Sequence, residues 1–147
     1  MAALKKRYYP KIAEEVYLAT LDNGMSLSII KKKGFIEKAA FLSTNFGALD
    51  NRFYIDGKLQ TYPAGIAHFL EHKLFEDDQG RDVTLDFVKL GADVNAFTTL
   101  DRTTYYFSTI DHFEESLELL LKFTSEFTSS EDTVNHEKRI IEQEINM

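Results

Sequence analysis

Two histidines and a glutamate stand close together in the order His-x-x-Glu-His, at positions 68–72. On a helix each residue advances by about 100°, so His68 and His72 project about 40° apart and Glu71 projects from the same face. Two imidazoles at this i,i+4 spacing can share one metal ion, and neutral imidazole nitrogen suits zinc. A carboxylate beside them can take a proton from water at the metal. The motif therefore predicts a catalytic zinc site with Glu71 as general base.

The simpler interpretation of this motif is a solvated helix face that happens to carry two histidines and a glutamate. The residues that flank the motif argue against it, because PAGIA before it and FL within it are small or apolar. A fully solvated face does not need such residues. Glu76 cannot complete the site from the same helix, since a straight helix rises about 5 Å per turn while zinc–ligand bonds are about 2 Å long.

The last predicted helix offers the missing ligand. Glu137 and Glu144 are two turns apart on one face, in the middle of an apolar stripe formed by Val134, Ile140, Ile141 and Ile145. Buried carboxylates are costly unless they are paired, protonated or bound to a metal. The alternative is that this helix frays at its end and both glutamates reach water. The pattern by itself does not rank Glu144 above Glu137 as a ligand.

Four segments together resemble the insulinase/pitrilysin family of zinc metallopeptidases, the inverzincins, which includes mitochondrial and bacterial processing peptidases. These segments are HFLEH at 68–72, NAFT at 95–98, TTYYFS at 103–108 and EKRIIEQE at 137–144. The stretch AGIAHFLEHKLFED is especially similar to bacterial cytoplasmic members. The resemblance covers nearly the whole chain and implies a zinc-dependent endopeptidase that hydrolyses extended peptides.

The resemblance also implies a role for each site residue. It implies that His68, His72 and Glu144 bind the zinc cofactor, that Glu71 is the general base, and that Glu137 supports the site by holding a ligand histidine in one tautomer. The family's Asn-Ala-x-Thr strand lines the cleft and pairs with the backbone of the substrate. Its counterparts here are Asn95, Ala96, Phe97 and Thr98.

Family members are usually built from repeated halves that close around a peptide substrate like a clamshell. The resemblance implies that residues 1–147 form the zinc-binding part of the first half, an incomplete N-terminal catalytic domain. Its expected partners are a peptide substrate and the remaining half-domains, in the same protein or in a partner subunit. A segment of this length can bind zinc and hydrolyse nothing, so a non-cleaving peptide- or partner-binding domain is the alternative. A purely structural zinc site would need four protein ligands, and only three are credible.

Composition excludes several other classes of protein. The chain has 147 residues, a formal net charge of −7 and no cysteine. The negative charge argues against binding to nucleic acid by phosphate neutralisation. The lack of cysteine excludes a disulfide framework or a thiolate zinc site. No apolar run approaches the roughly 20 residues of a membrane span, and residues 1–15 lack the apolar core of a signal peptide. We therefore expect a cytoplasmic protein with neither nucleic-acid nor membrane partners.

Periodicity and turn signals predict the elements that position these residues. Strands are expected at 16–21, 25–31, 36–46, 92–99 and 103–110, and helices at 64–76 and 82–90, after Asp111, and from Ser129 onward. Asp22-Asn23-Gly24 is a hairpin turn signal, residues 47–63 are expected to form a loop, and Asp111 is expected to cap the third helix with Glu114. The order predicts an α+β fold in which helices pack on one face of a largely antiparallel sheet, as in one half of the insulinase-family repeat that the chain resembles.

Overall fold

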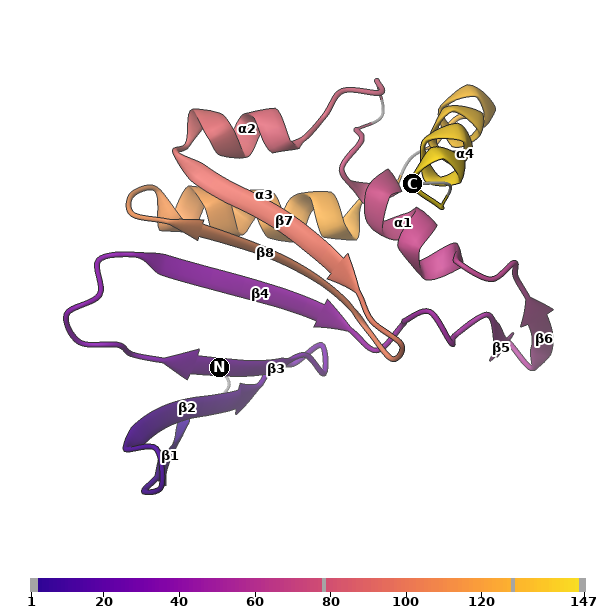
Figure 1. Ribbon diagram of the computed structural model, residues 1–147. Helices are drawn as coiled ribbons and strands as arrows, with labels where there is room; N and C mark the ends of the chain where they lie inside the picture. The colour runs from indigo at the N-terminus through magenta and orange to yellow at the C-terminus, as the bar shows by residue number, and fades with distance from the viewer. Residues whose placement is uncertain (1–2, 78, 128, 146–147) are drawn as a thin grey trace. The chain divides into compact units, whose positions relative to one another are not determined.

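The computed structural model describes residues 3–77, 79–127 and 129–145 of the chain (Figure 1). The chain divides into two compact units, Met1–Ile36 and Glu37–Met147. All paired strands are antiparallel. None of the helices in the described ranges has the length and apolar character needed to cross a membrane.

The first unit is a three-stranded sheet in the order β1-β2-β3, with β1 at Lys5–Tyr9, β2 at Glu14–Thr20 and β3 at Ser26–Ile30. The predicted turn joins β2 to β3. There Gly24 has a φ of 85° and the side chain of Asn23 accepts a hydrogen bond from the amide of Met25. Strand β1 was not predicted, because its sequence KKRYY begins with exposed cations and shows no alternation of apolar residues.

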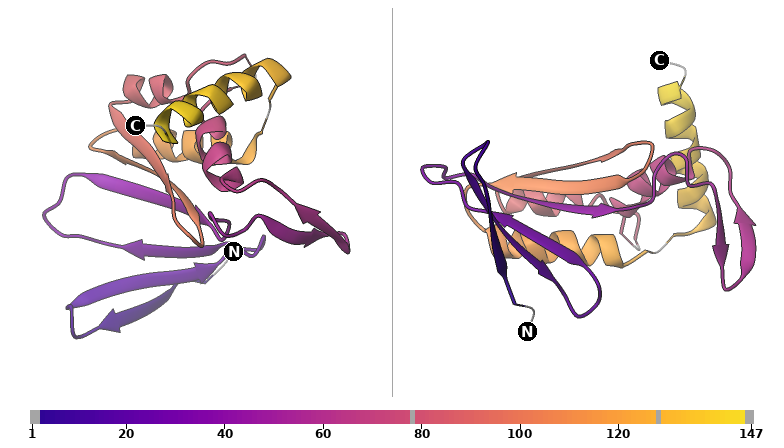
Figure 2. Two further views of the ribbon diagram at one scale, coloured as in Figure 1. Left: turned by 45° about the vertical axis from the view of Figure 1, so that its right-hand side comes forward. Right: turned by 90° about the horizontal axis from the view of Figure 1, so that it is seen from below.

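The second unit contains the sheet β4-β8-β7, with β4 at Lys38–Thr44, β7 at Ala92–Thr98 and β8 at Thr103–Thr109. Its helices are α1 (Ile66–Leu74), α2 (Thr84–Lys89), α3 (Phe113–Ser125) and α4 (Glu131–Ile145). Helices α2 and α3 lie along one face of this sheet, while α1 lies at the end of β7 and packs against α4 (Figures 1 and 2). This arrangement confirms the predicted α+β fold.

The core lies between that sheet and α2 and α3. Tyr105 and Phe107 of β8 turn toward the helices, where they meet Phe87 and Phe123. Burying side chains of this size contributes about 2–3 kcal/mol each. Because successive strand residues face opposite sides, Tyr106 lies on the other face and stacks on Phe41 with ring centroids 5.3 Å apart.

The prediction of a loop across residues 47–63 is wrong in part. Strands β5 (Arg52–Ile55) and β6 (Lys58–Thr61) pair there as a hairpin. Its turn is formed by Asp56 and Gly57, both with positive φ, of 49° and 74°. Asp-Gly is a preferred pair for such a two-residue turn. The signal was therefore present, but the four-residue strands around it are too short to show a clear period.

The predicted cap of α3 is also wrong. The N-cap is His112, which has a left-handed conformation with φ 55° and makes no side-chain capping bond. Its carbonyl accepts the first helical bond from Ser116 at 3.0 Å. Asp111 instead lies in the bend between β8 and α3, where its carbonyl accepts a hydrogen bond from the Thr109 hydroxyl at 2.5 Å. Gly91, which follows the C-cap residue Leu90 of α2, has a positive φ of 69°.

Gly47 anchors the segment after β4 against the turn between β7 and β8. A Cβ at this position would lie 2.6 Å from the nitrogen of Asp101 and would also meet the backbone of Arg102. We expect Gly47→Ala to lower the free energy of unfolding by about 2–3 kcal/mol, because backbone on both sides must shift. Gly91→Ala, in open space but at positive φ, is the control and should cost about 1 kcal/mol. Urea unfolding measures both, and a Gly47→Ala protein as stable as the wild type would contradict the expectation.

Candidate metal centre

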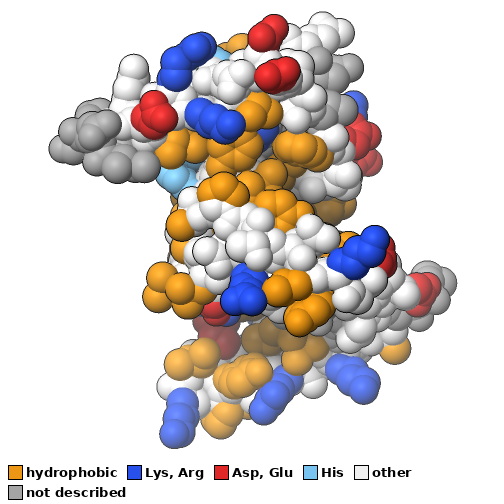
Figure 3. Space-filling view, turned by 90° about the vertical axis from the view of Figure 1, so that its right-hand side faces the viewer, with side chains coloured by type: hydrophobic (Ala, Val, Ile, Leu, Met, Phe, Trp, Pro, Cys, Tyr) orange, Lys and Arg blue, Asp and Glu red, His pale blue; other side chains and the backbone are white. Residues whose placement is uncertain are grey.

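Helix α1 brings the two motif histidines together. It begins after Gly65, whose φ of 87° suits glycine. From there the i,i+4 spacing places the Nε2 atoms of His68 and His72 3.1 Å apart, with the ring planes at 80°. The side chain of His68 is 42% exposed. In the space-filling view toward α1 and α4, histidine side chains reach the surface (Figure 3).

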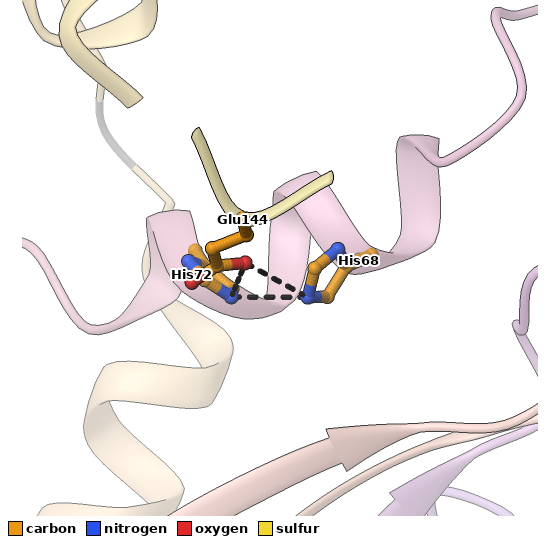
Figure 4. Close-up of side chains that lie close together, drawn as sticks. All are labelled: His68, His72 and Glu144. Carbon is orange, nitrogen blue, oxygen red and sulfur yellow. Dashed lines mark hydrogen bonds and ion pairs between the residues drawn. The ribbon is translucent and has the colours of Figure 1, made fainter. Parts of the chain in front are cut away.

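Helix α4 brings a carboxylate to the same point. An oxygen of Glu144 lies 3.9 Å from the Nε2 of His68 and 3.9 Å from the Nε2 of His72 (Figure 4). These three ligand atoms all lie within 4.8 Å of one another. The helix starts as predicted, since the Ser130 hydroxyl accepts a hydrogen bond from the amide of Thr133 at 3.3 Å. Residues far apart in the sequence therefore form one group of three potential metal ligands.

Another glutamate of α4, Glu137, contacts the ring nitrogen of His72 that faces away from His68. Glu137 is buried, and its Oε1 lies 2.9 Å from Nδ1 of His72. Because a carboxylate accepts hydrogen bonds, this contact favours the tautomer with a proton on Nδ1. The Nε2 lone pair of His72 is then free to face His68 and Glu144.

The donor set fits zinc. Two imidazole nitrogens and one carboxylate oxygen are ligands that zinc accepts, at bond lengths of about 2.0–2.2 Å. Two ligands of a tetrahedral zinc ion are then about 3.3 Å apart. The separations of 3.1 Å between the nitrogens and 3.9 Å from each nitrogen to oxygen are close to this value. Three protein ligands leave one position open, as in catalytic rather than structural zinc sites.

Glu71 lies beside this group and is only 8% exposed. Its Oε2 accepts a hydrogen bond from the hydroxyl of Thr98 on β7. Tyr105 lies nearby on β8: burial raises the pKa of its phenol above the ordinary range, and the charge of Glu71 raises this pKa further. The phenol is therefore neutral at physiological pH.

An ion pair with a buried lysine lies at the end of α1. Lys73 is 1% exposed and its ammonium contacts the carboxylate of Glu76. Sequence reasoning gave Lys73 no role, because a lysine in a helix is usually exposed. This contact engages the carboxylate of Glu76, which is outside the group formed by His68, His72 and Glu144.

The residues of NAFT at 95–98 are divided between the two faces of the sheet. Asn95 and Phe97 are exposed, and Phe97 lies 6.1 Å from the ring of Tyr106 on the face away from the helices. Ala96 and Thr98 turn toward the helices and are half-buried. A hollow of about 610 Å³ adjoins β7, lined in part by Asn95, Glu71 and His72. The structure thus brings Thr98 to Glu71 and leaves Phe97 on the opposite face.

Among the described residues, the other two histidines are outside the group formed by His68, His72 and Glu144. His112 is exposed at the start of α3, with its Nδ1 3.4 Å from the Glu115 carboxylate. His136 is exposed and lines the hollow next to Glu137. The contact that sequence reasoning missed is the one from Thr98 to Glu71. Strand alternation could have assigned Thr98 to the helix-covered face, although no sequence pattern places α1 there.

Residues 60–147 match the family model described as insulinase, peptidase family M16. The chain is 45% identical over 146 residues to the uncharacterized zinc protease YmfH of Bacillus subtilis, covering 98% of this chain and 34% of that protein. It is 31% identical over 131 residues to an insulin-degrading enzyme homolog of Dictyostelium discoideum. That match covers 86% of this chain and 13% of the Dictyostelium protein. The chain thus spans about a third of the length of YmfH.

Solved structures show the same fold. A structure described as an M16-like peptidase from Alicyclobacillus acidocaldarius superposes with a TM-score of 0.85 at 38% identity, over 91% of this chain and 31% of that one. A protease from Helicobacter pylori superposes with a TM-score of 0.70 at 20% identity, over 98% of this chain and 31% of that one. At that lower identity the likeness concerns the fold alone.

Proposed function

The chain belongs to the insulinase family, peptidase family M16, and from this premise we propose that it forms the zinc-binding part of a metalloendopeptidase that hydrolyses extended peptides. The observation that carries the proposal is the group of two histidines and one glutamate whose ligand atoms lie within 4.8 Å of one another. In this proposal His68, His72 and Glu144 hold the ion. Glu137 holds His72 in the tautomer that directs Nε2 toward the ligand group.

A zinc ion in this position would polarise a peptide carbonyl and make a water molecule more acidic. Glu71 would take the proton of that water and deliver it to the leaving amine. Its position supports this role, because it projects from the same helix face as both histidines and its carboxylate is largely shielded from solvent. Such shielding strengthens electrostatic interactions with a reacting group.

The substrate would bind as an additional strand. Strand β7 is at the edge of the sheet β4-β8-β7, so one row of its backbone groups can pair with an extended peptide. The end of β7 at Thr98 lies against Glu71, so a peptide along this edge would pass close to the metal ligands. We assign Asn95, Ala96 and Phe97 to this peptide-binding strand on the same grounds.

The rest of the catalytic apparatus would come from outside these residues. The chain spans 34% of YmfH and 13% of the Dictyostelium relative. We propose that further half-domains, in the same protein or in a partner subunit, close over the metal centre and hold the peptide from the other side.

The test combines metal content with peptide cleavage. Elemental analysis of the purified chain after dialysis against zinc should find about one zinc per chain. The protein at its full natural length should cleave an unstructured peptide, lose this activity with a chelator and regain it with zinc. A chain that holds no zinc, or cleavage that persists in excess chelator, would contradict the proposal. A zinc-loaded full-length protein that binds peptides without cutting them would instead favour the non-cleaving alternative.

A further inference from the structure

We propose that Thr98 is a positioning residue that fixes the carboxylate of Glu71; the catalytic part of this inference rests on the proposed role of Glu71 as general base. The hydroxyl of Thr98 donates to Oε2 of Glu71. Thr98 and Thr103 form the last pair of strands β7 and β8, and their hydroxyl oxygens are 3.2 Å apart.

Successive side chains of β7 point to opposite faces of the sheet, so Thr98 faces a different environment from Phe97. The pair Thr98↔Thr103 is on the helix-covered face of the sheet, and the preceding pair Phe97↔Thr104 has the opposite orientation. The side chain of Thr98 is therefore directed toward α1 and does not extend from the peptide-binding edge. A substrate strand would use backbone groups of this segment, which leaves the Thr98 hydroxyl available for Glu71.

The hydroxyl protons can be assigned by counting. Each threonine hydroxyl has one proton to donate. The hydroxyl of Thr103 is 2.8 Å from the carbonyl oxygen of Phe46, which can only accept, so the proton of Thr103 is used there. The proton of Thr98 then goes to the Glu71 carboxylate, which is a stronger acceptor than a neutral hydroxyl oxygen. Thr103 is thereby anchored to the segment next to Gly47, and Thr98 points its donor at Glu71.

The hydrogen bond from Thr98 fixes the position of the Glu71 carboxylate. Among the described residues, the Thr98 hydroxyl is the one group that hydrogen-bonds to the Glu71 carboxylate. A glutamate has three side-chain torsions, and a catalytic group must be held within about 0.5 Å of its productive position. With Oε2 held by Thr98, the other oxygen is left to receive a proton from water. Loss of the hydroxyl should therefore reduce turnover more than substrate binding.

The experiment compares Thr98→Val, Thr98→Ser and Thr104→Val in the zinc-loaded protein at its full natural length. Thr98→Val preserves shape and removes the donor, and it should lower kcat roughly ten- to hundredfold with KM and zinc affinity changed less than about twofold. Thr98→Ser keeps the hydroxyl and should return kcat to within about threefold of the wild type. Thr104→Val is the matched control: it removes a buried hydroxyl from the next position of β8, 2.8 Å from Ser43, and should change kcat less than about twofold.

A second measurement does not depend on activity. In protein labelled with ¹³C at glutamate carboxyl groups, the Glu71 resonance is identified by its loss in Glu71→Gln. It should shift in Thr98→Val and stay near its wild-type position in Thr98→Ser and Thr104→Val. A Thr98→Val protein with unchanged kcat and unchanged Glu71 resonance would overturn the inference, as would a serine variant as impaired as the valine variant. If the wild type cleaves no peptide, the proposed function fails, and the resonance alone decides whether Thr98 positions Glu71.

Discussion

Glu71→Gln is expected to leave zinc bound and to abolish most peptide hydrolysis. The glutamine amide has nearly the same shape, and its carbonyl oxygen can still accept the hydrogen bond from Thr98. It cannot take a proton from water at physiological pH. General-base catalysis is typically worth 10²–10⁴-fold, so we expect kcat to fall by roughly 10³-fold.

The measurement is steady-state cleavage of a peptide by the protein at its full natural length, together with zinc content by elemental analysis. Zinc content should stay within about twofold of the wild type, since Glu71 is not among the three grouped ligands. Glu118→Gln makes the same chemical change at an exposed position of α3 and should leave both quantities unchanged. Peptidase activity in Glu71→Gln equal to that of the wild type would show that another group is the base.

Glu144→Gln is expected to cause the largest loss of zinc affinity of any substitution in α4. An amide oxygen is a weaker zinc ligand than a carboxylate, and the site would keep two histidines alone. Removing a group that only supports a ligand typically costs about 10–100-fold in metal affinity. Removal of a ligand should cost at least the upper end of that range, so we expect zinc to bind about a hundredfold more weakly or worse.

Glu137→Gln distinguishes the proposed role of Glu137 from that of Glu144. A glutamine at 137 can still accept the proton on Nδ1 of His72, so we expect a loss of about tenfold. Both variants, and Glu131→Gln at the exposed start of α4 as a control, can be titrated against a coloured zinc chelator. A Glu137→Gln protein that loses more affinity than Glu144→Gln would reverse the two proposed roles.

The part of the metal centre that depends on local periodicity could be predicted from the sequence. The turn of one helix brings His68 next to His72, and the same period places Glu137 and Glu144 on one face of α4. Which carboxylate faces which histidine nitrogen depends on how α4 crosses α1: Glu137 faces Nδ1 of His72, and Glu144 faces the Nε2 atoms of both histidines. No local pattern encodes that crossing, because it is set by packing between elements far apart in the chain.

The errors in the predicted fold have local origins. The KKR segment of strand β1 is exposed on both sides of the strand. Because neither side is buried, its sequence does not alternate between apolar and polar residues. The hairpin β5-β6 was marked by Asp56-Gly57, but its strands are short. At α3 a local capping signal at Asp111 competed with the hydrogen bond from Thr109, which uses the Asp111 carbonyl, and the helix begins one residue later.

The ion pair of Lys73 and Glu76 has a consequence for how this sequence can evolve. With Lys73 1% exposed and its ammonium against the half-buried carboxylate of Glu76, loss of the Glu76 carboxylate alone would leave the Lys73 charge unpaired in the interior. Such an intermediate typically costs about 3–5 kcal/mol, whereas exchange of both for packed apolar residues is often neutral. Glu76 is therefore expected to persist across a lineage for as long as Lys73 does, under a constraint that comes from burial of the ammonium and not from the proposed metal site.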